Sequence, residues 1–342
     1  MALVTDVFTG NGWGVIDFQE EVVERTEFRP QLLGQLGIFE PIYSRSRTIA
    51  IADRDRTLTL IPTSELGAPP EELIPEGAKV RPFNTSRLAK GSTIYAAELA
   101  GIAALPFDLQ TREVSQELAD RTAQIMNDLE LTWEHMRFGA IQGKVLDADG
   151  STLIDWFSEW GVAEPTEINF ALTTDTTDVR KKCRDVKRAM VKAAKGIWTP
   201  ATRVGALVGD TFYDLLLNHK QIKETRLVDG NRASSLEDIE GYSSIEIEGI
   251  TFINYRGTDD GSTISIDTAK AKFFPINARG AFKVGFSPAN EFKPYLNQRA
   301  REYYGLMLAD TSGREAWDRV EIYSYPLFIC TRPEMIQTGR AS

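Results

Sequence analysis

The sequence predicts an α+β fold, and three observations lead to it. An apolar stripe at helical spacing runs through residues 107–138, and a shorter one runs through residues 178–195. From residue 200 onward, short strand-like runs are mixed with another helical pattern. With 342 residues, 42% of them hydrophobic, the chain is long and apolar enough to bury a sizeable core around both kinds of element.

The first 45 residues predict an extended arm. Gly10, Gly12 and Gly14 lie close together, a short helix is expected at 17–26, and apolar anchors follow at 32–39 without a helical period. A segment of this kind buries too little surface to fold alone, so we expect it to lie on another surface.

Residues 46–61 predict a β-hairpin, in which residues 48–51 and 57–61 flank a polar turn. Residues 63–91 follow and are rich in Pro, Gly and charge. A loop this long in a compact domain is usually functional or disordered. Because strand-like segments at 58–61 and 93–97 flank it, we expect a projecting two-stranded loop, with disorder as the alternative.

The helix at 107–138 is expected to begin near Asp108 or Thr111 and to end at Gly139. Its apolar stripe consists of Val114, Leu118, Ile125, Leu129, Trp133 and Met136. A hairpin should follow, with strands at 144–146 and 152–157. The helix at 178–195 should stop at Gly196, and its stripe consists of Val179, Cys183, Val186, Met190 and Ala193.

The second half of the chain supplies the remaining elements. Strands are expected at 203–208, 244–248, 251–255 and 282–286, together with a helix at 210–219 and an apolar, basic run at 270–276. A final long strand is expected at 317–332, in which Pro326 predicts an edge position or a bend.

No catalytic, cofactor-binding or metal-binding residues are predicted. His135 and His219 stand apart from any histidine or cysteine cluster, so we interpret them as solvated or core side chains. Cys183 and Cys330 are expected to be reduced, packed thiols. Residues 147–151 resemble the start of a calcium loop, but the glycine stands at the fourth position instead of the sixth, so a β-turn is expected. The sequence therefore does not predict an enzyme.

The net charge of −10 argues against tight binding of nucleic acid, although a local basic face remains open. Such a face would contact phosphates or form the solvated side of an amphipathic helix, balanced by Asp178 and Asp185, and we favour the second interpretation. Its residues are Arg180, Lys181, Lys182, Arg184, Lys187 and Arg188. The sequence contains neither an apolar run of 18 residues nor a secretory signal, so we expect a cytosolic site of synthesis and no membrane partner.

The order of several short segments resembles the lambda-type major capsid proteins, the capsid protein E family of tailed phages. The most distinctive segment is GAIQGKV at 139–145, directly after the long helix. The others are LGIF at 36–39, the hairpin at 48–60, and segments at 75–77, 81–85, 273–275 and 323–327. The resemblance spans nearly the whole chain, and it depends on the order and spacing of these segments together.

This resemblance implies the Hong Kong 97 phage capsid fold. The parts it implies are an N-terminal arm at 1–45, an extended loop at 46–100, a peripheral domain at 101–169 with a spine helix at 107–138, an axial domain at 170–310, and a C-terminal strand at 311–342 that returns to the peripheral domain. Some members of the wider fold crosslink their loops through a Lys–Asn isopeptide bond, and Lys79 and Lys90 are expected in the loop. No acceptor asparagine or catalytic glutamate is assigned for such a bond.

The implied function is that of a major capsid protein. Its copies would form hexamers and pentamers of an icosahedral head around double-stranded DNA, and the procapsid would expand on maturation. The implied partners are further copies, a separate scaffolding protein, the portal, an optional decoration protein and, through weak non-specific contact, the packaged DNA. The implied location is the virion, after assembly in the host cytoplasm. The alternatives are an encapsulin-like cargo shell and a soluble binding module or enzyme with a pocket.

Overall fold

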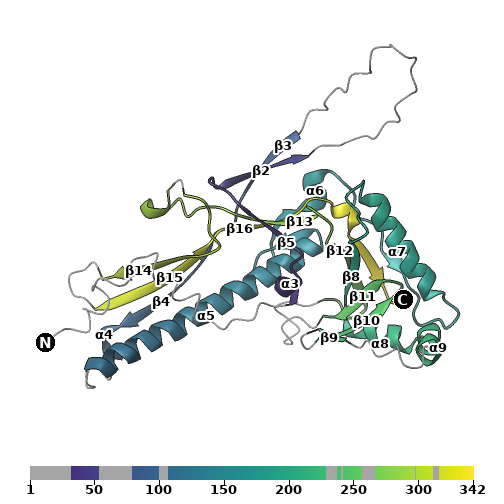
Figure 1. Cartoon of the computed structure of the whole chain (residues 1–342), viewed down its shortest axis with the longest axis horizontal. Coiled ribbons are helices and arrows are strands. Elements are labelled where there is room, and N and C mark those ends of the chain that lie inside the picture. The colour runs from purple at the N-terminus through teal and green to yellow at the C-terminus, as the bar shows by residue number, and fades with distance from the viewer. Residues whose placement is uncertain are drawn as a thin grey trace, which may run out of the picture.

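The computed structural model describes residues 32–53, 79–99, 107–228, 237–239, 242–255, 266–296, 298–310 and 316–342. These residues form two packed regions joined by one long helix, and a hairpin projects from the middle (Figure 1). The helix expected at 17–26, the glycines at 10–14 and the strand expected at 57–61 lie outside the described residues.

The long helix α5 (Phe107–Ile141) has 35 residues, which corresponds to about 52 Å. Its stripe is buried as predicted from Leu118 to Met136. The helix passes Gly139, so the predicted end was wrong. A Cβ at Gly139 would lie 2.6 Å from the carbonyl oxygen of Lys144. This glycine therefore lets the returning strand approach the helix, and Gly143, with φ +84°, makes the reversal.

A three-stranded antiparallel sheet lies along α5 (Figure 1). Its order is β14 (Tyr304–Ala309), β15 (Trp317–Ser324) and β4 (Leu88–Tyr95). Ile94 and Val320 pack against Leu118 of the helix, and Ile322 packs against Ile125 and Leu129. Alternate residues of the strands therefore bind the sheet to the helix.

The strand expected at 317–332 is two strands in two sheets. After β15, the chain bends at Tyr325 and continues as β16 (Pro326–Cys330), an edge strand of the sheet β1-β13-β16. Strand β16 pairs with β13 (Phe282–Phe286), which runs antiparallel to it, and the other side of β13 pairs with β1 (Glu40–Tyr43), which runs parallel to β13. The prediction of a bend or edge at Pro326 is confirmed.

The projecting hairpin pairs β2 (Thr48–Asp53) with β3 (Lys79–Asn84). The predicted pairing of residues 48–51 with 57–61 involves a segment outside the described residues, and the pairing with 79–84 was not predicted because rules for short turns consider only nearby partners. The observed register places Ile49 opposite Phe83, and both side chains are buried. The hairpin of β5 (Lys144–Leu146) and β6 (Thr152–Asp155) is confirmed, and it leads into α6 (Trp156–Trp160).

The second region contains a mixed seven-stranded sheet. In spatial order its strands are β7 (Ile168–Asn169), β17 (Gln337–Arg340), β12 (Lys270–Ile276), β8 (Arg203–Val208), β11 (Ile250–Asn254), β10 (Tyr242–Ile247) and β9 (Glu237–Ile239). The helices α7 (Val179–Ala193) and α8 (Asp210–Asn218) share a core cluster with Val204, Ala206 and Val208 of β8. The alternate residue Leu207 belongs to the cluster at the end of α5, so each face of the sheet is covered differently.

The remaining elements are short. They are α3 (Leu32–Gln35), α4 (Ala96–Leu99), α9 (Lys220–Val228) and the turns η2 (Lys293–Tyr295) and η3 (Pro333–Met335). Helix and sheet are mixed without alternation along the chain, which confirms the α+β prediction.

Candidate assembly surfaces

The N-terminal segment is anchored on α5 by a buried carboxylate. Leu32 and Leu33 of α3 are 2% and 0% exposed. Glu134 of α5 accepts hydrogen bonds from the backbone N–H of Leu33 at 2.9 Å and of Gly34 at 3.2 Å. The hydroxyl of Tyr255 donates to the same carboxylate at 3.3 Å. The segment therefore meets the spine helix through apolar burial and charge-assisted hydrogen bonds together.

Glu134 belongs to a small network of charges. The guanidinium of Arg137 lies 3.6 Å from Glu134 and 3.5 Å from Glu130, and it stacks over the ring of Trp133 at 5.6 Å. The hydroxyl of Tyr303 donates to Glu130. Burial raises the pKa of Glu134, while the amide donors and Arg137 oppose this rise. The network binds two helix carboxylates to one cation and leaves no free nucleophile or acid–base pair.

A cavity of about 160 Å³ is lined by residues of both the N-terminal segment and the body of the protein. Its lining includes Gly34, Phe39, Trp133, Arg137 and Glu302. The indole N–H of Trp133 is buried without a protein acceptor. The space is large enough for several water molecules. We therefore interpret the cavity as part of the seat of the N-terminal segment.

The root of the projecting hairpin is fixed by aromatic packing. The ring of Phe83 packs against Trp156 at 5.2 Å, and the guanidinium of Arg81 lies over Trp160 at 5.5 Å. On the other strand, Ile49 occupies the space where a side chain at position 285 would lie: a Cβ on Gly285 would be 2.2 Å from its Cδ1. Further out, Val80 is 60% exposed. The hairpin is thus held at its base and presents apolar surface beyond it.

The far end of the sheet beside α5 also presents apolar surface. Tyr95 is 53% exposed and Leu308 is 41% exposed. Arg121 of α5 binds this end to the helix by donating to the carbonyl oxygen of Thr93 at 2.8 Å and pairing with Glu98. A well-ordered strand end with uncovered apolar side chains is a suitable contact surface for another chain.

The residues considered for chemistry do not come together. The Nε2 atom of His135 lies 3.3 Å from the carbonyl oxygen of Asp147, and Nε2 of the buried His219 lies 3.2 Å from that of Thr174. Cys183 and Cys330 are buried free thiols in different core clusters, and burial raises the pKa of each to about 12. Within the described ranges, no three His, Cys, Asp or Glu side chains gather into a possible metal site.

Two further predictions are resolved. Residues 147–151 form a turn, in which Gly150 has φ +82° and Asp149 accepts from the backbone N–H of Ser151. Lys90, which was expected in the extended loop, lies in β4 and pairs with Asp128. Lys79 begins β3.

In the part of the chain that the structure describes, no helix is both long and apolar enough to cross a membrane.

Sequence reasoning did not single out Glu134 or Arg137. One signal was present: Glu130, Glu134, Arg137 and Ile141 follow a spacing of four, three and four, which places them in one row beside the apolar stripe. The partners of this row, however, come from residues about 100 positions away in either direction. Helix periodicity contains no information on such partners.

The sequence of residues 20–341 matches the family model described as phage major capsid protein E. A curated relative, the major capsid protein of Salmonella phage Felix O1 (isolate Felix O1-VT1), is 23% identical over 252 residues, which cover 65% of this chain and 67% of the relative.

Solved structures show the same fold. The capsid protein assigned to a prophage of E. coli CFT073 gives a TM-score of 0.58 at 14% identity, over 95% of this chain and 98% of that one. The mature capsid of bacteriophage PhiM1 gives a TM-score of 0.50 at 11% identity, over 89% and 85% of the two chains. The fold is the Hong Kong 97 phage capsid fold, as the resemblance implied. Since the family model matches more than nine-tenths of the sequence, the chain belongs to the phage major capsid protein E family.

Proposed function

We propose that this chain assembles into hexamers and pentamers that form the icosahedral head of a tailed phage around its double-stranded DNA. Membership of the capsid protein E family supports a shell subunit over a soluble binding module. Closed rings of one chain need head-to-tail contacts, in which one surface meets a different surface of the next copy. The projecting hairpin and the seat of the N-terminal segment are two such different surfaces.

The observation that carries the proposal is the projecting hairpin β2–β3. It leaves the body of the molecule (Figure 1) and presents apolar Val80 to solvent, while its root is packed firmly against Trp156. Ordering an extension costs conformational entropy, which is offset only by buried surface. A neighbouring copy supplies that surface in a shell.

The sheets suggest how the chain divides. We assign α5 with β4, β14 and β15 to the peripheral domain, and the seven-stranded sheet with α7, α8 and α9 to the axial domain. This assignment places 304–309 with the peripheral part and 337–340 with the axial part, because their strands pair there. It differs from the domain limits drawn along the sequence at these two segments and also at 88–95 and 168–169, whose strands belong to the peripheral and the axial sheet respectively.

The remaining features of the function follow from the family. We propose that the chain is not an enzyme, that it assembles in the host cytoplasm with a scaffolding protein and the portal, and that it becomes part of the virion. A decoration protein is an optional partner. Expansion of the procapsid would follow DNA entry.

Removal of the residues between β2 and β3 tests the proposal. Residues 54–78 are replaced by Asn-Gly, a two-residue turn that can join Asp53 to Lys79 in their observed pairing. Co-expressed with its scaffold, the wild-type chain should form shells visible by electron microscopy. The shortened chain should stay soluble and folded by circular dichroism but form no stable shells. A wild-type chain that remains a small species by sedimentation would refute the function, and normal shells from the shortened chain would refute a role in assembly for the residues between β2 and β3.

A further inference from the structure

We propose that the outward face of α7 is a binding surface for the phosphate backbone of double-stranded DNA. The inference rests on the proposed function, since it assigns the surface through which a shell subunit contacts the packaged genome. Residues 178–195 contain eight basic and two acidic side chains, whereas the whole chain has a net charge of −10. The helix is therefore a strongly basic segment in an acidic protein.

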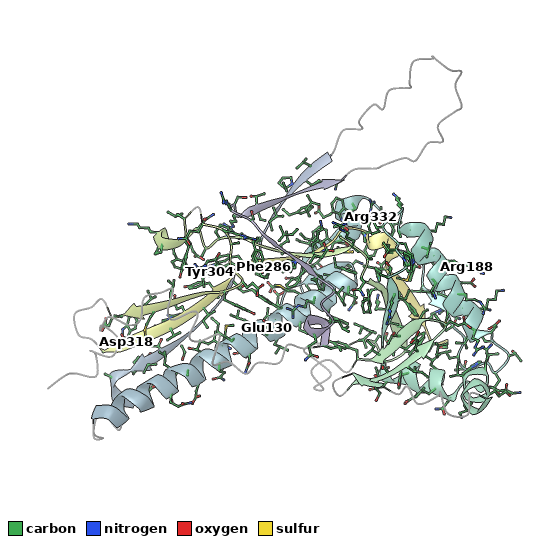
Figure 2. All side chains as sticks on the ribbon, viewed as in Figure 1. Glu130, Arg188, Phe286, Tyr304, Asp318 and Arg332 are labelled. Atoms are coloured by element: carbon green, nitrogen blue, oxygen red, sulfur yellow. The ribbon has the colours of Figure 1, made fainter. Side chains whose placement is uncertain are left out.

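The buried and basic faces of α7 are opposite each other. Val179, Cys183, Val186 and Met190 are all 0% exposed and hold the helix on the sheet. Successive residues of a helix are rotated by 100° about its axis, and the side chains on the face opposite the four buried ones lie within an arc of about 80°. These are Lys181, Arg184, Arg188 and Lys192, all exposed. Figure 2 shows Arg188 on the outer side of the helix, directed away from the sheet.

Some of the cations of α7 have a structural role. Lys187 donates to the carbonyl oxygen of Glu248 at 2.9 Å, and Arg180 lies 3.7 Å from the Glu248 carboxylate. Arg184 lies 3.5 Å from the same carboxylate and 3.8 Å from Asp178. These contacts bind the helix to the turn between β10 and β11. The basic character of α7 is therefore only partly explained by its attachment to the sheet.

Lys181, Arg188 and Lys192 make no such contact with the described strands of the sheet. No carboxylate in the described ranges lies within ion-pair distance of Lys181 or Lys192, and Arg188 pairs only with Asp185 of its own helix, with its side chain 74% exposed. Arg184, Arg188 and Lys192 follow each other at intervals of four, where like charges destabilise a helix. A face kept only for solubility gains from mixed signs. A single-sign face of this kind fits a polyanion.

The dimensions suit duplex DNA. From Lys181 to Lys192 the helix rises about 16 Å. Duplex DNA carries one phosphate per about 1.7 Å of its axis, so the phosphates are dense enough to meet every cation in the row. Three contacts predict that log K falls with log salt concentration with a slope of about −2.7, which is about a 40-fold loss of affinity between 50 and 200 mM salt. Such weak, sequence-independent contact is compatible with DNA that must later leave the head.

The test uses the unassembled full-length chain and a fluorescent 20-base-pair duplex of arbitrary sequence, with binding followed by anisotropy at several salt concentrations. The variant K181Q/R188Q/K192Q should lose at least ten-fold in affinity at 50 mM salt, and its slope should approach zero. The matched control R45Q/K223Q/K293Q removes three exposed cations elsewhere and should bind as the wild type does. Equal loss in both variants, or no binding by the wild type, would overturn the proposal.

Two further measurements separate the possible outcomes. A polyglutamate peptide is tested in place of DNA: if the α7 variant loses peptide binding but retains duplex binding, the surface serves an acidic protein and the DNA assignment is wrong. Shell formation with the scaffold is scored for all three chains. Shells from the α7 variant together with its DNA-binding defect support the proposal. If the α7 variant forms shells and binds DNA normally, the role of this surface in DNA binding is refuted but the proposed function is not. If the wild type forms no shells, the proposed function is refuted.

Discussion

Replacing Glu134 with alanine tests whether a buried carboxylate holds the N-terminal segment on the spine helix. The change leaves the N–H groups of Leu33 and Gly34 and the hydroxyl of Tyr255 without their acceptor. Each unmade bond of this kind costs about 1–3 kcal/mol. Arg137 keeps Glu130 as a partner, and loss of a buried charge relieves part of the cost. We therefore expect a net loss of about 3 kcal/mol in the free energy of unfolding.

The assay is urea denaturation of the unassembled chain, followed by tryptophan fluorescence. The matched control is Glu117→Ala on the same helix, where the carboxylate is 44% exposed and pairs with Arg121. That control should lose no more than about 1 kcal/mol. Limited proteolysis should cut the N-terminal segment faster in the Glu134 variant than in the control. If the two variants are equally stable and equally resistant, the anchoring role is refuted.

The pH dependence of the same site has a defined sign. Burial raises the pKa of Glu134 in the folded protein, so the folded state binds a proton more readily than the unfolded state. The penalty for burying the charge is absent below the ordinary pKa of a glutamate and complete above the raised one. The stability of the wild type relative to Glu134→Gln should therefore increase as the pH falls from 7 through the raised pKa. A difference that is constant or decreases over this range contradicts the assignment.

Two other regions give sharp predictions. Gly143→Ala should destabilise the chain by about 2–4 kcal/mol in thermal unfolding, because φ is +84° and the new Cβ would lie 2.4 Å from the ring of Phe157. The control is Gly150→Ala, where φ is +82° but the new Cβ would meet no atom, and it should cost about 1 kcal/mol. Cys183 and Cys330, with pKa values raised to about 12, should not react with a thiol reagent at pH 8 until urea unfolds the chain; rapid reaction of either thiol in the native protein would contradict their burial.

Local elements could be predicted from the sequence because their signals are local. The stripe of α7, with Val179, Cys183, Val186 and Met190, gave its buried face and nearly its limits. The strand at 203–208 was evident from its continuous apolar run. Pro326 marked the bend between two strands because proline cannot donate a ladder hydrogen bond.

Long-range pairing could not be predicted in the same way. Strand β2 finds its partner at 79–84, and no local rule ranks that segment above the nearer one at 57–61. Strand β14 was missed, because residues 304–309 become a strand by pairing with β15. Glu134 looks like an ordinary helix glutamate in the sequence, and its role depends on Leu33 and Tyr255, which the fold brings to it.

The N-terminal segment and the β2–β3 hairpin are both attached to the same core cluster, which limits how the subunit can change on assembly. Leu32 and Leu33 of the N-terminal segment, Ile49 and Phe83 of the hairpin, and Ile141 at the end of α5 belong to a single core cluster. Exposing the two leucines alone costs about 3–6 kcal/mol, before the bonds to Glu134 are counted. We therefore expect the buried side chains of this cluster to stay fixed while contacts between copies form and exchange at the exposed parts of the two extensions, such as Val80.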